Sequence, residues 1–187
     1  RAGINFNSLP DEKFDEPLGL STGAGVIFGA TGGVMEAAIR TAVHTLTGED
    51  VLELPELRGT DGIKEATYKV GDLEIKVAVV SGLSNAKEVL EKVQKGEADY
   101  QFIEIMACPG GCVNGGGQPQ QPSSVRNFVD IRSERAKVLY DLDKAMPLRK
   151  SHENPAIKAV YDEFFGKPGS HKAHEVLHTS YVKRSVN

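Results

Sequence analysis

The spacing of apolar residues predicts a helix from about Val34 to Thr47. Glu36 and Arg40 stand one turn apart, which suggests an ion pair on the outer face of this helix, and Gly48 is a suitable C-terminal stop. The apolar side chains recur every three or four residues, as they do along one face of an α-helix: Met35, Ile39, Ala42, Val43 and Leu46.

The next segment predicts a strand, a strand, a helix and a strand. Residues 68–70 and 73–80 alternate β-branched and polar side chains around Gly71-Asp72, which indicates two strands joined by a tight turn. A helix follows from Ser84 or Asn85, either of which is a suitable cap, to about Lys95. The side chains expected to face inward on it are Ala86, Val89, Leu90 and Val93. Residues 100–106 form a further buried strand. Because a strand, helix and strand of these lengths make a crossover unit, the last two strands are expected to be parallel.

The remaining elements are loops and C-terminal helices. The loops are 21–33, which is glycine-rich, and 49–62, with at most a short strand at 51–54; the helices are 123–144, capped by Ser123 or Ser124, and 155–165. Residues 1–20 form an irregular lead-in and residues 170–187 a C-terminal tail. The predicted fold class is therefore α/β, with a parallel or mixed sheet flanked by helices and a helical C-terminal region, in one domain over residues 1–187.

Composition excludes several classes of function. With 187 residues and 40% hydrophobic content the chain can bury a core. A net charge of -4 with mixed signs lacks the basic footprint of a nucleic-acid-binding protein, and no apolar run is long enough for a membrane span. Two cysteines do not make a disulfide scaffold, so a reducing compartment, the cytoplasm, is expected. The periplasm is the alternative. The chain begins at Arg1, which suggests a piece of a longer protein.

Both cysteines fall in one glycine-rich stretch, Phe102 to Pro119, which reads FIEIMACPGGCVNGGGQP. Thiolates suit iron-sulfur clusters, zinc and cuprous copper, and glycines allow a backbone to approach a bulky inorganic group closely. Zinc remains possible, although zinc ribbons favour two intervening residues and a second matching pair. A disulfide or two inert buried thiols is the simplest alternative. A phosphate-binding loop is excluded because no lysine follows Gly115 or Gly116.

Three further features have competing interpretations. The loop with Gly23, Gly25 and Gly29 resembles a loosened dinucleotide-binding fingerprint, but no convincing strand precedes it, and tight helix packing explains it as well. Three histidines, His171, His174 and His178, share one helical face; a solvated terminal helix is a simpler explanation than a metal site. Glu104 has no visible acid-base partner and suits a structural contact at a strand end.

The cysteine stretch resembles one family in particular. Its pattern Glu104-x-Met106-Ala107-Cys108-x-Gly110-Gly111-Cys112-x-x-Gly115-Gly116-Gly117-x-Pro119 is similar to the third cysteine motif of the FeFe-hydrogenases (iron-only hydrogenases). The segment TGAGVIFGATGGVMEAAIR also looks like the one that precedes this motif in their catalytic domains. The resemblance extends from about Ser21 onward and implies one lobe of the hydrogenase catalytic domain, in its C-terminal part.

What this resemblance implies is an H-cluster, in which four cysteines hold a 4Fe-4S cubane and one of them bridges to a diiron subcluster. By motif position, Cys108 and Cys112 would be cubane ligands, with Cys112 as the catalytic bridge, while Phe28 and Met106 would line the diiron pocket. The implied reaction is the reversible reduction of two protons by two electrons to hydrogen.

The sequence also departs from the family. The first two cysteine motifs of these enzymes have no counterpart here, so half of the cubane ligands would come from the N-terminal part of the catalytic domain or from a partner subunit. An electron carrier such as ferredoxin is the other expected partner. The alternative function is a non-catalytic iron-sulfur or redox-sensing module of the same fold.

Overall fold

The structure is a computed structural model that describes residues 2–13, 15 and 20–185. It divides into two compact units, one made of residues 21–154 and the other of residues 1–20 and 155–187. The predicted lead-in falls partly outside the described residues. In its described part there is one short 3-10 turn, Phe6–Ser8.

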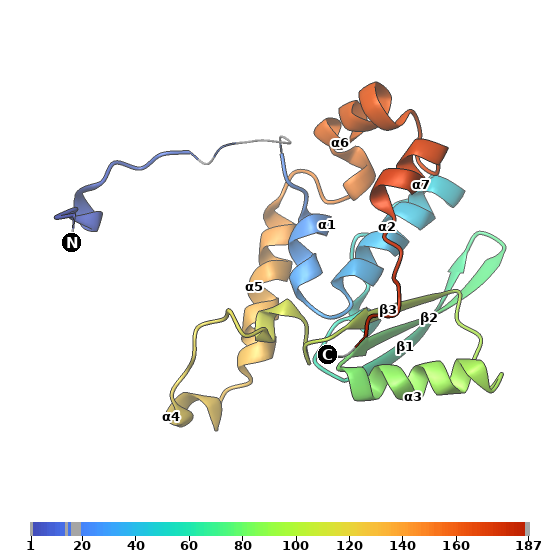
Figure 1. Ribbon diagram of the computed structural model, residues 1–187, viewed down its shortest axis with the longest axis horizontal. Helices are drawn as coiled ribbons and strands as arrows, with labels where there is room; N and C mark the ends of the chain where they lie inside the picture. The colour runs from blue at the N-terminus through green and yellow to red at the C-terminus, as the bar shows by residue number, and fades with distance from the viewer. Residues whose placement is uncertain (1, 14, 16–19, 186–187) are drawn as a thin grey trace. The chain divides into compact units, whose positions relative to one another are not determined.

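The larger unit contains a mixed three-stranded sheet in the order β1-β2-β3 (Figure 1). β1 (Ile63–Val70) and β2 (Leu73–Ser81) form the predicted hairpin, with Val70 opposite Leu73 across the Gly71-Asp72 turn. α3 (Leu83–Gln94) then crosses over to β3 (Phe102–Met106), which runs parallel to β2. The expectation of a parallel or mixed sheet flanked by helices is confirmed, and the sheet is mixed.

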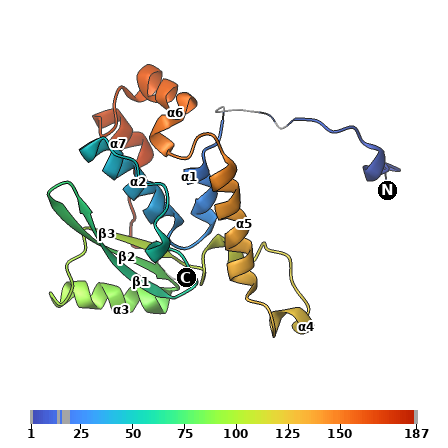
Figure 2. The same ribbon diagram turned by 180° about the vertical axis from the view of Figure 1, so that it is seen from behind.

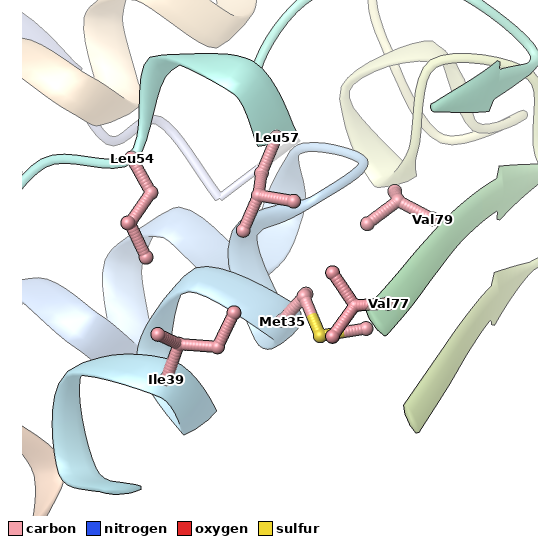
Figure 3. Close-up of a cluster of buried hydrophobic side chains, with 6 residues drawn as sticks. All are labelled: Met35, Ile39, Leu54, Leu57, Val77 and Val79. Carbon is pink, nitrogen blue, oxygen red and sulfur yellow. The ribbon is translucent and has the colours of Figure 1, made fainter. Parts of the chain in front are cut away.

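The two faces of this sheet bury separate apolar clusters. α2 (Gly33–Thr47) covers one face and α3 the other, as the two opposite views show (Figures 1 and 2). The α3 side consists of Ala78, Val80, Ala86 and Val89. The α2 side, drawn in Figure 3, consists of Met35, Ile39, Leu54, Leu57, Val77 and Val79. Val77 and Val79 of β2 point to the α2 side, whereas Ala78 and Val80 point to the α3 side. Both faces of this strand are therefore buried, which explains the continuous apolar run Val77–Val80.

The prediction of a buried final strand was wrong. Within the described chain β3 is paired on one side only, so it is an edge strand, and its Phe102 and Ile105 side chains are exposed. Glu104 is its buried residue. Apolar composition alone does not separate a central strand from an edge strand, because both carry β-branched and aromatic side chains.

The glycine-rich segment before α2 is more helical than predicted. Residues 21–33 contain α1 (Gly23–Val26) and a 3-10 turn, Ile27–Gly29. α2 ends at Gly48 as expected, with a φ angle of 74°. Instead of a strand at 51–54, a segment without regular structure leads into a 3-10 turn, Pro55–Leu57, which carries the buried Leu57.

Several side-chain expectations on the helices were also wrong. Leu46 on α2 is exposed, as are Leu90 and Val93 on α3. The Glu36–Arg40 ion pair exists, at 2.7 Å, but it is fully buried instead of lying on the outer face. No side chain caps α3, because its N-cap residue is Gly82; the predicted caps Ser84 and Asn85 lie within the helix, where the Asn85 amide donates to the carbonyl of Ser81.

The helix predicted over 123–144 is two helices. α4 (Ser123–Arg126) ends after one turn, and α5 (Ile131–Ala145) begins at Asp130, whose carboxylate accepts from the N–H groups of Arg132 and Ser133. The predicted caps Ser123 and Ser124 instead form the first residues of α4. An N-cap aspartate starts a new helix, and the apolar residues Phe128 and Val129 that suggested continuity are exposed.

The smaller unit is helical over its C-terminal segment. α6 (Pro155–Val160) continues as a π-helical turn, Tyr161–Phe165, in agreement with the predicted second helix. α7 (His171–Leu177) lies in the predicted tail. Across the described residues, no helix has the length and apolar character needed to cross a membrane.

Candidate functional site

The two cysteines lie where the sequence places them, directly beyond the carboxyl end of β3. The strand ends at Met106; Cys108 follows in a bend, and Cys112 begins a 3-10 turn, Cys112–Asn114. Both thiols are free, with Cys108 half-buried and Cys112 exposed. The alternative of a disulfide between them does not apply to this structure.

The cysteine loop, defined as residues 107–119, closes on itself through local hydrogen bonds. The Gly111 N–H donates to the Cys108 carbonyl and the Gly115 N–H to the Cys112 carbonyl, both at 2.9 Å. Gly110 and Gly111 have φ angles of 85° and 98°, which side-chain-bearing residues rarely adopt. A Cβ on Gly115 would stand 4.0 Å from the Cys108 sulfur, at ordinary contact distance, so glycine here places no side chain beside the thiol.

The Cys108 half of this loop packs against the turn before α2. The Thr31 N–H donates to the Gly110 carbonyl at 3.1 Å, and the Gly110 N–H donates to the Ser81 hydroxyl at 3.2 Å. A Cβ on Gly111 would meet the Thr31 nitrogen at 2.7 Å, so only glycine allows this close approach of the two backbones. Gly111 thus allows the cysteine loop to pack directly against the backbone of residues 29–31.

Glu104 ties β3 to the start of α2. Its carboxylate oxygens accept from the N–H groups of Gly32 and Met35, each at 2.7 Å, so it acts as the N-terminal cap that α2 lacks locally. The interpretation of Glu104 as a structural contact is therefore confirmed. The same turn is held by the buried Lys64, whose ammonium donates to the carbonyls of Thr31 and Gly59. Burial lowers the pKa of Lys64 to about 8, against the attraction of Glu104 and Asp61.

The two pocket residues implied by the family resemblance lie on separate elements. Phe28, in the turn between α1 and α2, is partly exposed and lines an apolar hollow of about 540 Å³ on the surface of α2, together with Val34, Ala38 and Ala42. Met106 is half-buried at the end of β3, and its carbonyl accepts from the Gly82 N–H. The assignment of both residues to a diiron pocket remains a prediction.

A buried ion network lies on α2 and α5, and sequence reasoning predicted only its Glu36–Arg40 pair. Asp143 on α5 binds Arg40 on α2 at 2.7 Å, and Arg149 contacts the same carboxylate at 2.7 Å. Glu36 pairs with Arg40 and also with Arg58. Although burial raises it, hydrogen bonds from Arg40 and Arg149 lower the pKa of Asp143 overall. The network fixes α5, and with it the far side of the cysteine loop, to α2.

The other candidate sites are not supported. The first glycine loop forms α1 and packs against α5, which favours the packing interpretation over a nucleotide site. His174 and His178 contact each other by their ring edges on and after α7. Among the described residues, no three histidine, cysteine or acidic side chains gather closely enough to hold a metal ion.

The cysteine loop nevertheless fits a shared metal cluster. It presents two free thiols, and thiolates are the soft ligands that iron-sulfur clusters require. Beside the Cys108 sulfur stands Gly115, which has no side chain. Two thiolates do not satisfy a four-coordinate closed site, so the fit is to part of a donor set. Fold and loop together define a class: an α/β protein with a cysteine pair at the carboxyl end of a sheet strand.

Comparison with known proteins identifies the family within this class. Residues 1–116 match the model for the "Iron only hydrogenase large subunit, C-terminal domain", and residues 129–184 match that for the "Iron hydrogenase small subunit". The chain belongs to the iron-only hydrogenase family.

Individual relatives include both hydrogenases and a protein named differently. The chain is 51% identical to the NADP-reducing hydrogenase subunit HndD of Solidesulfovibrio fructosivorans over 98% of its length and 31% of that protein. It is similar to a solved structure of [FeFe]-hydrogenase HydA1 from Chlamydomonas reinhardtii, with a TM-score of 0.68 and 43% identity over 96% of this chain and 51% of that one. It is also 33% identical to Protein NAR1 of Arabidopsis thaliana, over 98% of this chain and 40% of that protein. The chain spans about a third of the length of its curated hydrogenase relatives.

Proposed function

We propose that this chain forms the C-terminal part of the catalytic domain of an FeFe-hydrogenase, which reversibly reduces protons to hydrogen at an H-cluster. When bound, that cluster supplies the electron transfer and the hydrogen chemistry. Cys108 and Cys112 supply two thiolates to its cubane, with Cys112 as the catalytic bridge to the diiron subcluster. The remaining ligands come from outside these 187 residues.

In this proposal the protein residues position and shield the cluster. The cysteine loop holds the two thiolates at the end of β3, where Glu104, Lys64 and the turn before α2 keep it in place. Phe28 and Met106 present apolar surface toward the diiron side and limit access by water and oxygen. The observation that carries the proposal is the pair of free thiols in a glycine-rich loop in which Gly115 places no side chain beside Cys108.

A reconstitution experiment tests the proposal. The chain is combined with the N-terminal part of the catalytic domain, loaded with iron, sulfide and the diiron subcluster, and assayed with a reduced electron donor. We expect hydrogen evolution and the infrared bands of carbonyl and cyanide ligands. Cys112→Ser should reduce hydrogen evolution by at least about 100-fold, because the bridging thiolate is a direct ligand of the reacting centre. Undiminished turnover in this variant would remove Cys112 from its assigned role.

A second candidate function is favoured by the similarity to Protein NAR1. In that case the loop holds an iron-sulfur cluster without a diiron subcluster, and the protein acts as a non-catalytic iron-sulfur or redox-sensing module. The same reconstitution separates the two: an assembled protein that contains iron and sulfide, but has no carbonyl or cyanide bands and evolves no hydrogen, belongs to the second class.

The proposed partners follow from the incomplete donor set. They are the N-terminal part of the catalytic domain or a partner subunit, and an electron carrier such as ferredoxin. The proposed compartment is the cytoplasm, because two unpaired thiols persist most readily where the environment is reducing. Cell fractionation with an antibody against the chain tests the compartment, and recovery in the periplasm would contradict it.

A further inference from the structure

Arg135 on α5 binds the half of the cysteine loop that follows Cys112. Its guanidinium donates from Nη1 to the Val113 carbonyl at 2.9 Å and from Nη2 to the Pro119 carbonyl at 2.6 Å. Val113 is the residue directly after Cys112, and Pro119 closes the loop. One planar side chain thus fastens both ends of the 113–119 segment to a helix, which the rigid fork of an arginine can do and a lysine cannot.

The other hydrogen bonds of this half-loop stay within the cysteine loop. Among the described residues, the other hydrogen bonds from the loop to distant parts of the chain lie at Gly110, through Thr31 and Ser81. After Cys112 the other bonds are local: the Gly115 N–H donates to Cys112 and the Gln118 N–H to Gly115, while Asn114 donates from its backbone to Gly111 and from its side-chain amide to Pro109. Cys112 itself is exposed, between the buried Gly111 and the buried Val113. Within the described residues, Arg135 is the side chain from a distant element that hydrogen-bonds to the backbone after Cys112.

The contact also joins two regions that match separate family models. Val113 belongs to the region matched by the large-subunit model, and Arg135 to the region matched by the small-subunit model. Arg126 lines the same polar hollow as Arg135, but in the described structure it makes no hydrogen bond to the loop. Both arginines thus line the same hollow, but only the Arg135 guanidinium hydrogen-bonds to the cysteine loop in the described structure.

We propose that Arg135 is a positioning residue that fixes the backbone after Cys112 and so sets the direction of the Cys112 thiolate. The second part of this statement rests on the proposed function, since a thiolate needs a set direction only as a ligand. The first part stands on the two carbonyl contacts alone. The hydrogen bonds of Arg135 go to two loop carbonyls, so it acts through the loop.

Residue-resolved amide hydrogen exchange on the cluster-free, full-length protein tests the first part. Arg135→Gln should speed exchange at the Gly115 and Gln118 amides about ten-fold, a factor that corresponds to about 1.4 kcal/mol of local opening free energy. The Gly110 and Gly111 amides, held from the other side, should stay unchanged. Arg135→Lys should give a smaller increase, and it replaces the glutamine variant if that variant fails to fold.

Arg126→Gln is the matched control, because it removes one positive charge from the same hollow and no bond to the loop. It should leave all four amides unchanged. Equal exchange in Arg135→Gln and the parent protein would overturn the proposal, and so would an equal increase in the Arg126→Gln control. An increase spread over Gly110 and Gly111 as well would indicate general destabilisation and would also overturn it.

Iron release from the cluster-loaded protein to a chelator tests the second part. Arg135→Gln should release iron about ten-fold faster than the parent and Arg126→Gln at the parent rate. Equal release rates would overturn the effect on the thiolate. Should the parent protein hold no cluster, the proposed function fails, while the exchange experiment still decides whether Arg135 fixes the loop.

Discussion

At the scale of single residues, Gly23 shows how closely α1 must approach α5. A Cβ at this position would overlap Asp143 Oδ1 and stand 3.0 Å from its Cα. Gly23→Ala therefore forces apart the helix and the buried carboxylate that binds Arg40 and Arg149. We expect it to lower the free energy of unfolding by about 3 kcal/mol, as overpacking combined with a strained buried ion pair does. Urea unfolding followed by circular dichroism measures this loss.

Gly25→Ala is the control in the same short helix. Its Cβ would meet the Ser21 and Thr22 hydroxyl oxygens at 3.7 Å, an ordinary contact, and alanine favours a helix more than glycine does. The stability should stay within about 1 kcal/mol of the parent protein. A similar loss in both variants would show that neither glycine position of α1 tolerates a side chain and that the approach to Asp143 is not the cause.

Some residues of the candidate site could be predicted from the sequence and others could not. Cys108 and Cys112 could be found because their thiols and the surrounding glycines are local in sequence. The Glu36–Arg40 pair could be found from its spacing, but its burial could not, because Asp143 lies 103 residues from Arg40. Arg135 carries no local signal, since its partners are backbone carbonyls, which every residue possesses.

At the scale of elements, α2 depends on a cap from another strand. Gly32, its N-cap residue, has no side chain, and the Glu104 carboxylate accepts the two backbone N–H groups instead. Glu104→Gln leaves one oxygen for two donors and removes a negative charge near the buried Lys64. We expect a loss of about 3 kcal/mol in the free energy of unfolding, measured in urea, since charge-assisted hydrogen bonds contribute about 1.5–3 kcal/mol each.

Asp130→Asn makes the same acid-to-amide change at an exposed helix start. Asp130 caps α5 through Arg132 and Ser133, and asparagine caps helices about as well as aspartate. The expected loss is below about 1 kcal/mol. If Glu104→Gln cost no more than this control, the cap on α2 would contribute little beyond an ordinary exposed one.

Elements were predictable where their own residues determine them. The β1–β2 hairpin follows from Gly71-Asp72 between alternating strands, and the parallel pairing of β2 with β3 follows from the crossover through α3. The edge position of β3 was not predictable, because it depends on which strand lies beside it. Asp130 is a typical N-cap residue and could have indicated the start of α5. The apolar residues on either side of it suggested one continuous helix instead.

At the scale of the whole molecule, the chain joins two regions that match a large-subunit and a small-subunit model. The segment between them, residues 117–128, is largely exposed, and in the described structure Gln120 and Gln121 make no backbone hydrogen bond to the rest of the chain. A protease site inserted between these two residues should therefore be cut without loss of fold. Gel filtration after cutting should show the pieces 1–120 and 121–187 eluting together, as the uncut protein does.

Hydrogen bonds and buried ion pairs should hold the two pieces of the cut protein together. The second piece contributes Asp143 and Arg149, which bind Arg40 and the Leu52 carbonyl of the first piece, and the Leu148 carbonyl accepts from the Gly23 N–H. Breaking a buried ion pair costs about 3–5 kcal/mol, which corresponds to more than a hundred-fold change in association. Asp143→Ala in the cut protein should thus release the second piece on the same column, whereas Asp130→Asn, far from these contacts, should not. Separation of the pieces before any substitution would show that an intact 117–128 segment holds the two regions together, with the buried charges in a secondary role.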